Sequence, residues 1–125
     1  MPDICPITAR WPSAFSAVQL IFNRETPRHR DTGSWSTLYD IVVSIGPYSN
    51  AEFEFSNAGI LCAYPPGTVI ALCGKVLRHA VSSFTGERIC YAYFMRESTL
   101  AYAGVKFPHW MERGQYIDEN EYEDV

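Results

Sequence analysis

Turn-forming residues interrupt the apolar runs of this chain at short intervals, and this spacing limits the fold more than any other feature. The interruptions fall at residues 46–47, 57–59, 64–67, 74–75 and 85–86, each rich in Gly, Pro or Asn. Turn signals at this rate are typical of a β-sandwich or β-barrel. About eight short strands fit between them. The sequence therefore predicts a mainly β fold with few or no long helices.

The expected strands differ in how clearly the sequence marks them. Residues 51–55 alternate, which places Phe53 and Phe55 on one face and the two glutamates on the other. Residues 13–22 are apolar nearly throughout and fit a strand or a helix, but their abrupt end at Asn23 favours a strand. The remaining expected strands are 38–45, 60–63, 68–73, 76–81 and 88–95, with an edge strand within 4–11 and a weaker one at 100–107.

The 125 residues, 47% of them hydrophobic, are enough for one core. We expect a single domain over 1–125, with its core at about 13–107 and a peripheral acidic tail at 108–125. The four cysteines form no CxxC pair, and no secretory leader precedes them, so we expect reduced thiols in an intracellular protein. The apolar runs are too short to span a bilayer, which predicts no membrane partner.

The net charge of −4 excludes a polybasic protein that binds nucleic acid over its whole surface. Any contact with nucleic acid must be local. The one basic loop contains Arg24, Arg28 and Arg30, which fit phosphate contacts and a solvated loop equally well. The oligomeric state does not follow from the sequence.

Two histidines and an aspartate form a candidate metal site. His29-Arg30-Asp31 lies in or beside a loop at a strand end, where ligands can converge. His79 shares an apolar strand face with Leu77 and Val81, so it is either a satisfied core histidine or a ligand. Two imidazoles and one carboxylate are the facial ligand set of non-haem Fe(II) oxygenases.

Arg88 is the candidate for binding an acidic cosubstrate. On the expected strand 88–95 it shares a face with Cys90 and Ala92, whose small side chains leave room beside the guanidinium. A guanidinium can bind the distal carboxylate of 2-oxoglutarate through two parallel hydrogen bonds. The alternative is a solvent-exposed arginine on an edge strand.

Three stretches of this chain resemble the TET/JBP group of Fe(II)/2-oxoglutarate dioxygenases, which oxidises methylated bases. They are FSAVQLIFNRETPRHRD, GTVIALCGKVLRHAV and RICYAYFM, within residues 15–96. The resemblance implies a double-stranded β-helix, which is a jelly-roll or cupin-like barrel, and the cofactors Fe(II) and 2-oxoglutarate. It also implies that the iron ligands and catalytic residues are His29, Asp31 and His79, with Arg88 on the 2-oxoglutarate carboxylate.

The resemblance departs from the group at two positions. Cys90 stands where the animal enzymes usually have a serine that also contacts the 2-oxoglutarate carboxylate, and Ser34 stands where they have an asparagine near the target base. Both positions leave the corresponding contact without its usual side chain. His109, the remaining histidine, is expected to be structural or exposed.

The function that follows from the resemblance is hydroxylation of a C–H bond. The expected substrate is the methyl group of a 5-methylcytosine-like base in nucleic acid, flipped into the barrel mouth. The alternatives are the same chemistry on a small molecule or a protein side chain, and a degenerate barrel that acts as a binding module. With DNA as the substrate, the expected location is the nucleus.

Overall fold

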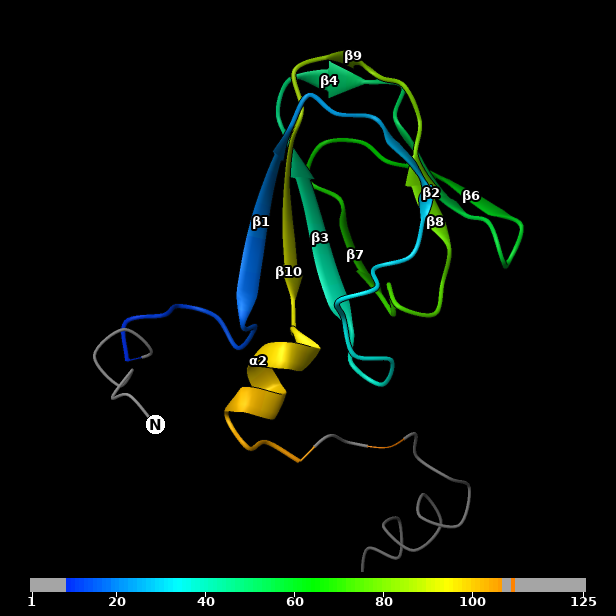
Figure 1. Cartoon of the computed structure of the whole chain (residues 1–125). Coiled ribbons are helices and arrows are strands. Elements are labelled where there is room, and N and C mark those ends of the chain that lie inside the picture. Colours follow the sequence, from blue (N-terminus) through cyan, green and yellow to red (C-terminus); the bar gives the residue numbers. More distant parts are fainter. Residues whose placement is uncertain (1–8, 107–108, 110–125) are drawn as a thin grey trace, which may run out of the picture.

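Two four-stranded antiparallel sheets face each other in the computed structural model, which describes residues 9–106 and 109 (Figure 1). The first sheet has the order β1 (Ala17–Phe22), β10 (Ile89–Phe94), β3 (Asp40–Ile45) and β7 (Val69–Leu72). The second has the order β2 (Thr26–His29), β8 (His79–Val81), β5 (Glu52–Phe55) and β6 (Ile60–Ala63). The short pair β4 (Tyr48–Ser49) and β9 (Thr85–Gly86) lies at one end. The fold is the jelly-roll type of the double-stranded β-helix, as predicted.

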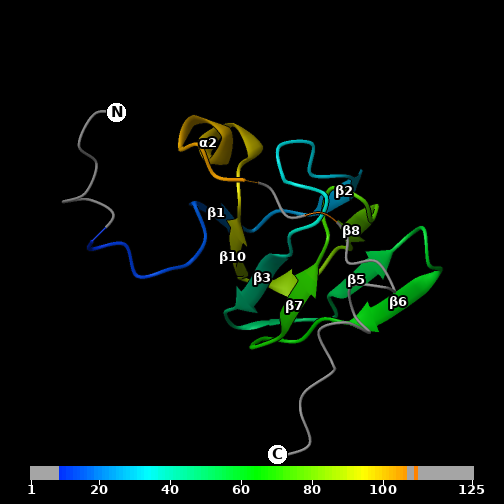
Figure 2. The same ribbon diagram turned by 90° about the horizontal axis from the view of Figure 1, so that it is seen from below.

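The core lies between the two sheets, which are seen from below as two layers in Figure 2. Phe53 from the second sheet, Leu72 from the first and Tyr64 from a connecting segment are almost fully buried and pack in one cluster. Burial of these large side chains is the main stabilising contribution to such a fold. The core fills one part of the space between the sheets and leaves cavities in the rest.

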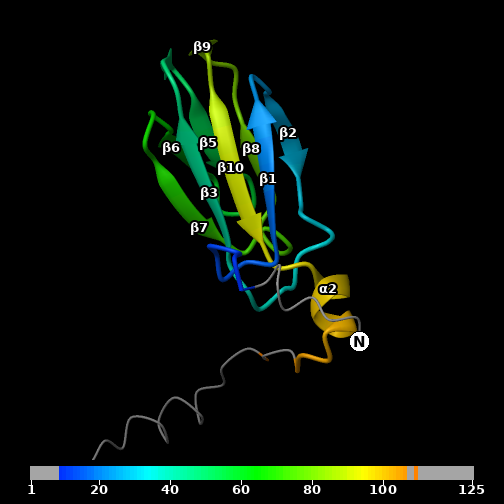
Figure 3. The same cartoon turned by 90° about the vertical axis from the view of Figure 1, so that its left-hand side faces the viewer.

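Side chains alternate across the first sheet, so its two faces differ in composition. The inward face carries small or polar residues, among them Gln19, Ser44 and Cys90. The outward face is apolar, and Leu20 and Phe22 on β1 are exposed. Figure 3 views the molecule from this outward side. The described residues include no helix long and apolar enough to cross a membrane.

Most of the expected strands form, including the alternating segment at β5, where the Phe53 and Phe55 rings lie 5.0 Å apart. The expected strand 76–81 is wrong over its first half. The backbone amides of Val76 and Leu77 both donate to the carbonyl of Cys73, so this part turns and β8 begins only at His79. The expected turn at 85–86 instead pairs as β9 with β4.

The expected strand at 100–107 is also wrong, because a short helix, α2 (Glu97–Tyr102), forms there. Arg96 makes an isolated bridge to Ser34, and beyond it no described strand offers a partner. The backbone therefore bonds locally, from Leu100 to Arg96 and from Ala103 to Thr99. Glu, Leu and Ala in this segment favour a helix.

Three further expectations fall partly outside the described residues. Residues 9–11 do not form the expected edge strand, and 1–8 lie outside, as does the acidic tail except for exposed His109. Cys62, Cys73 and Cys90 are free thiols, while Cys5 also lies outside. The single domain over 1–125 stays a prediction.

Candidate metal centre

The two histidines and the aspartate of the predicted site converge at one point between β2 and β8. His29 ends β2 and pairs with His79, the first residue of β8, after a register shift within β2, and Asp31 follows two residues after His29. His29 Nε2 lies 3.2 Å from Asp31 Oδ1, and His79 Nε2 lies 3.5 Å from Asp31 Oδ2. All three potential ligand atoms lie within 4.8 Å of one another. Bonds of about 2.1 Å to one ion fit such a separation.

Backbone carbonyls fix the orientation of both imidazole rings. His29 Nδ1 lies 2.9 Å from the carbonyl oxygen of Pro27, and His79 Nδ1 lies 2.9 Å from that of Leu77. A carbonyl oxygen only accepts hydrogen bonds, so each Nδ1 acts as a donor and Nε2 is the ring nitrogen left to bind a metal ion. Both Nε2 atoms face the Asp31 carboxylate, as ligands of one cation would. The residues therefore fit a metal ion.

Packing holds His79 and Asp31 in place. The His79 ring is 5% exposed and stacks on Phe53, with ring centroids 5.8 Å apart and planes 4° from parallel. The backbone amide of Asp31 donates to the carbonyl of Gly74 at 2.9 Å. A Cβ on Gly74 would overlap Oδ2 of Asp31 and Oδ2 of Asp40, so only glycine fits beside the two carboxylates.

A cavity of about 270 Å³, here called the Arg88 hollow, extends from this centre to Arg88. The Arg88 side chain is 2% exposed, so the alternative of a solvent-exposed arginine is wrong. Its Nε donates to Ser44 Oγ at 2.7 Å, but no carboxylate pairs with it in the part of the chain that the structure describes. Cys90 and Ala92 line the same hollow, as the strand alternation predicted. A buried guanidinium without a counter-ion is a site for an anion.

The sequence did not identify Tyr64, which lines this hollow, or Ser44, which accepts the hydrogen bond from Arg88. The Tyr64 ring centroid lies 5.1 Å from the Arg88 guanidinium carbon, and its hydroxyl makes no geometrically acceptable hydrogen bond to another described group. Burial raises the pKa of Tyr64 to about 12, so the hydroxyl stays protonated and can donate. Burial likewise raises the pKa of the Cys90 thiol. No local signal marks Tyr64, which stands out only beside Arg88.

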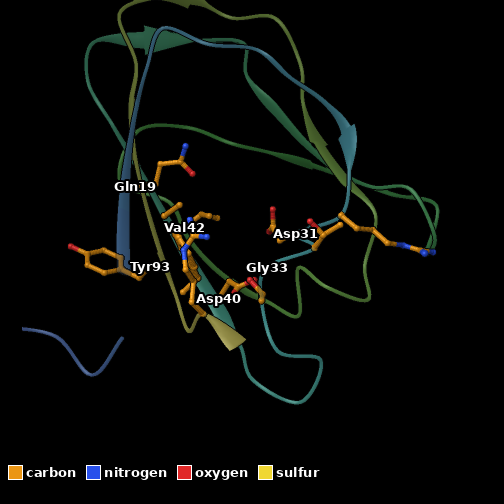
Figure 4. A pocket seen from close by; sticks show the side chains of 12 residues that line it. Gln19, Asp31, Gly33, Asp40, Val42 and Tyr93 are labelled. Carbon is orange, nitrogen blue, oxygen red and sulfur yellow. The ribbon is translucent and has the colours of Figure 1, made fainter. Parts of the chain in front are cut away.

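A second cavity, here called the Asp40 hollow, has a volume of about 340 Å³ and shares Asp31 with the Arg88 hollow. Figure 4 shows its walls, with Asp31 across from Gln19 and Val42. Ser34 and Asp40 are buried in its lining, at 3% and 4% exposed, and the Ser34 hydroxyl bonds to the Asp40 carboxyl. The two hollows thus meet at the candidate metal position.

The Asp40 carboxyl is the most perturbed acid in the described residues. Burial, opposed by the hydrogen bond from Ser34 and reinforced by the charge of Asp31, raises the pKa of Asp40 to about 6. Its Oδ2 atom has no hydrogen-bond partner among the described groups. No local sequence signal marks this residue, because an aspartate near the start of an apolar strand resembles a turn residue.

The three arginines of the predicted basic loop lie in different surroundings. Arg28 pairs with Glu54 at 2.9 Å, Arg24 lines the Arg88 hollow and Arg30 lines the Asp40 hollow. Arg96 joins Arg30 at the Asp40 hollow, and neither makes a salt bridge among the described residues. Two cations without a carboxylate partner among the described residues therefore line the second cavity, and the Arg96 guanidinium lies over the Phe94 ring, 5.3 Å from its centroid.

Comparison with known families gives one match. The Tet/JBP family model, described as the oxygenase domain of the 2OGFeDO superfamily, matches residues 1–97. This range contains every residue that lines the two hollows. No curated protein matches the chain.

Proposed function

This chain belongs to the Tet/JBP family of Fe(II)- and 2-oxoglutarate-dependent oxygenases, and from this premise we propose roles for its residues. His29, Asp31 and His79 hold the iron. Arg88 receives the distal carboxylate of 2-oxoglutarate in the Arg88 hollow. The observation that carries the proposal is the buried Arg88 side chain, which has no acidic partner and lines the cavity that begins at the three ligands.

The side chains of the Arg88 hollow bind and orient the cosubstrate. Arg88 offers its guanidinium to the carboxylate while Ser44 holds Nε, and the protonated Tyr64 hydroxyl supplies a further donor. The hydrogen bonds from Nδ1 to Pro27 and Leu77 keep both imidazoles aimed at the metal position before it is filled. When bound, Fe(II) and 2-oxoglutarate supply the oxidation, with one oxygen atom of O₂ entering the substrate and 2-oxoglutarate leaving as succinate and CO₂.

The substrate we propose is a methylated nucleobase in nucleic acid, 5-methylcytosine first, hydroxylated at its methyl group. The family supports this class, and the Asp40 hollow supplies a second cavity that meets the first at Asp31. A base inside a duplex is out of reach, so it enters this cavity flipped out of the stack. Arg30 and Arg96 line this cavity and would contact the neighbouring phosphates. For a DNA substrate, the protein acts in the nucleus.

The test combines metal binding, turnover and product analysis. Anaerobic titration with Fe(II) should show one tight site in the unmodified protein and in His109→Ala, which alters an exposed histidine, but not in His79→Ala. With Fe(II), ascorbate, 2-oxoglutarate and a 5-methylcytosine oligonucleotide, mass spectrometry should detect the hydroxymethyl base. Binding of the oligonucleotide should weaken as salt rises.

Two outcomes distinguish a wrong substrate from a wrong assignment of the iron ligands. Succinate formed without any change in the oligonucleotide, in reactions where His79→Ala forms none, would retain the proposed ligands and overturn the nucleobase substrate. Tight Fe(II) binding by His79→Ala would overturn the ligand assignment itself.

A further inference from the structure

We propose that Asp40 recognises the exocyclic amino group of the target base, so that the site accepts 5-methylcytosine and rejects thymine. The two bases carry the same methyl group and differ beside it, where cytosine has an amino group and thymine a carbonyl oxygen. The inference rests on the proposed nucleobase function and adds the residue that sets its specificity.

The first observation is a buried acceptor atom without a donor. Asp40 is 4% exposed, and its carboxyl accepts hydrogen bonds from the Ser34 hydroxyl and the Gly74 backbone amide, yet its Oδ2 atom has no hydrogen-bond partner among the described groups. No described lysine or arginine pairs with Asp40, although Arg30 and Arg96 line the same cavity. A buried acceptor left unpaired is costly, so a ligand that brings an N–H donor gains affinity here.

The second observation is that Asp40 lies beside Asp31, a proposed iron ligand. Asp40 and Asp31 both line the Asp40 hollow, and their Oδ2 atoms both abut Gly74. A group bonded to Asp40 therefore lies next to the carboxylate that holds the iron. In 5-methylcytosine the amino group and the methyl group are on adjacent ring carbons. Anchoring the amino group at Asp40 places the methyl group beside it, near the reacting centre.

The third step is how Asp40 would discriminate 5-methylcytosine from thymine. Thymine would present its carbonyl oxygen to a carboxylate that only accepts, so two acceptors would face each other in a buried site. A carboxylate can instead accept a hydrogen bond from the amino group of cytosine, which is how acidic side chains recognise this base. A polar site of this kind rejects the wrong partner more strongly than an apolar pocket does. Ser34, in place of the asparagine expected from the family resemblance, serves Asp40 as a donor and leaves the recognition to it.

The experiment is a competition between two oligonucleotides that differ only in 5-methylcytosine or thymine at one position. The full chain is incubated with Fe(II), ascorbate and 2-oxoglutarate, and mass spectrometry measures both hydroxymethyl products. The unmodified protein should favour 5-methylcytosine by roughly tenfold or more. Asp40→Asn should lower that ratio by about ten- to a hundredfold, because the amide can donate to the thymine carbonyl. Glu87→Gln, the same carboxylate-to-amide change at an exposed acid that lines neither hollow, should leave the ratio unchanged.

Anaerobic binding of 2-oxoglutarate to each Fe(II)-loaded variant shows that the barrel and the iron site are intact. If Asp40→Asn fails this check, Asp40→Ala takes its place and should abolish the preference without reversing it. An unchanged ratio in a variant that binds 2-oxoglutarate normally would overturn the role of Asp40 while the nucleobase function stands. Succinate without oxidation of either base would overturn both.

Discussion

The Arg88 hollow and the Asp40 hollow both begin at Asp31 but are lined by buried charges of opposite sign. One contains Arg88, which is 2% exposed and whose guanidinium lacks a carboxylate partner among the described residues. The other contains Asp40, which is 4% exposed and whose Oδ2 atom has no hydrogen-bond partner among them. Because an unpaired buried charge is costly, each cavity favours a different ligand. The candidate metal centre therefore lies between a cavity that suits an anion and a cavity that suits a hydrogen-bond donor.

The walls of the two hollows differ as well. The Arg88 hollow is bounded mostly by strand residues, and the buried rings of Phe53 and Tyr64 belong to its lining. The Asp40 hollow takes much of its lining from loop residues 30–34 and from the exposed Arg96. Rigid strands suit the binding of a cosubstrate that is the same in every reaction. Loops on such a scaffold commonly set the specificity for the substrate.

The largest effect is expected at Asp31, the proposed metal ligand that lines both hollows. Asp31→Ala removes the carboxylate that faces both imidazoles, so we expect loss of tight Fe(II) binding and of measurable succinate formation. Anaerobic titration and a succinate assay would show both losses together. Retention of normal iron affinity would mean that the two hollows do not meet at a metal.

The next largest effect is expected on 2-oxoglutarate binding, and it should distinguish the roles of the two hollows. Arg88→Ala removes the buried cation, and we expect 2-oxoglutarate affinity to fall by about ten- to a hundredfold or more, while iron affinity changes little. Arg96→Ala alters an arginine of the other hollow and should leave 2-oxoglutarate binding unchanged. Calorimetry on the Fe(II)-loaded proteins would measure both. The reverse result would exchange the assignments of the two cavities.

A smaller effect is expected at the glycine between the two acids. In Gly74→Ala the new methyl group would displace the carboxylates of Asp31 and Asp40, so we expect iron affinity to fall by roughly tenfold with every ligand still present. Gly33→Ala is the matched control, because a Cβ there meets its nearest atom, in Arg96, at an ordinary 3.9 Å. Equal iron affinity in the two variants would count against close packing at Asp31.

The smallest effect concerns pH. Because the pKa of Asp40 is raised to about 6 from 3.8, the folded, metal-free protein binds this proton more tightly than the unfolded chain does. Its contribution to the free energy of unfolding is fully present below pH 3.8 and is lost as pH rises through 6. Asp40→Asn should flatten the dependence between these values in urea titrations. An unchanged slope would show that Asp40 is less buried than the structure places it.

The sequence allowed much of the fold and part of the site to be predicted. Alternation at 51–55 gave the correct face for Phe53, and the face shared by Arg88 and Cys90 lines the Arg88 hollow. Local alternation is readable because neighbouring strand residues point to opposite sides whatever the rest of the chain does. The same reasoning was wrong at 76–78 and 100–107, where hydrogen bonds to Cys73 and Arg96 close a turn and a helix.

The sequence by itself determined which side chains could take part: two imidazoles, one carboxylate near them in the chain, and an arginine that opens a strand. Only the tertiary structure decided that His29 and His79 pair, that Arg88 is buried without an acid, and that Asp40 stands beside Asp31. The physical reason is that these contacts join strands far apart in the chain. Pairing between strands and packing between the two sheets set their partners and burial, and no local pattern encodes either.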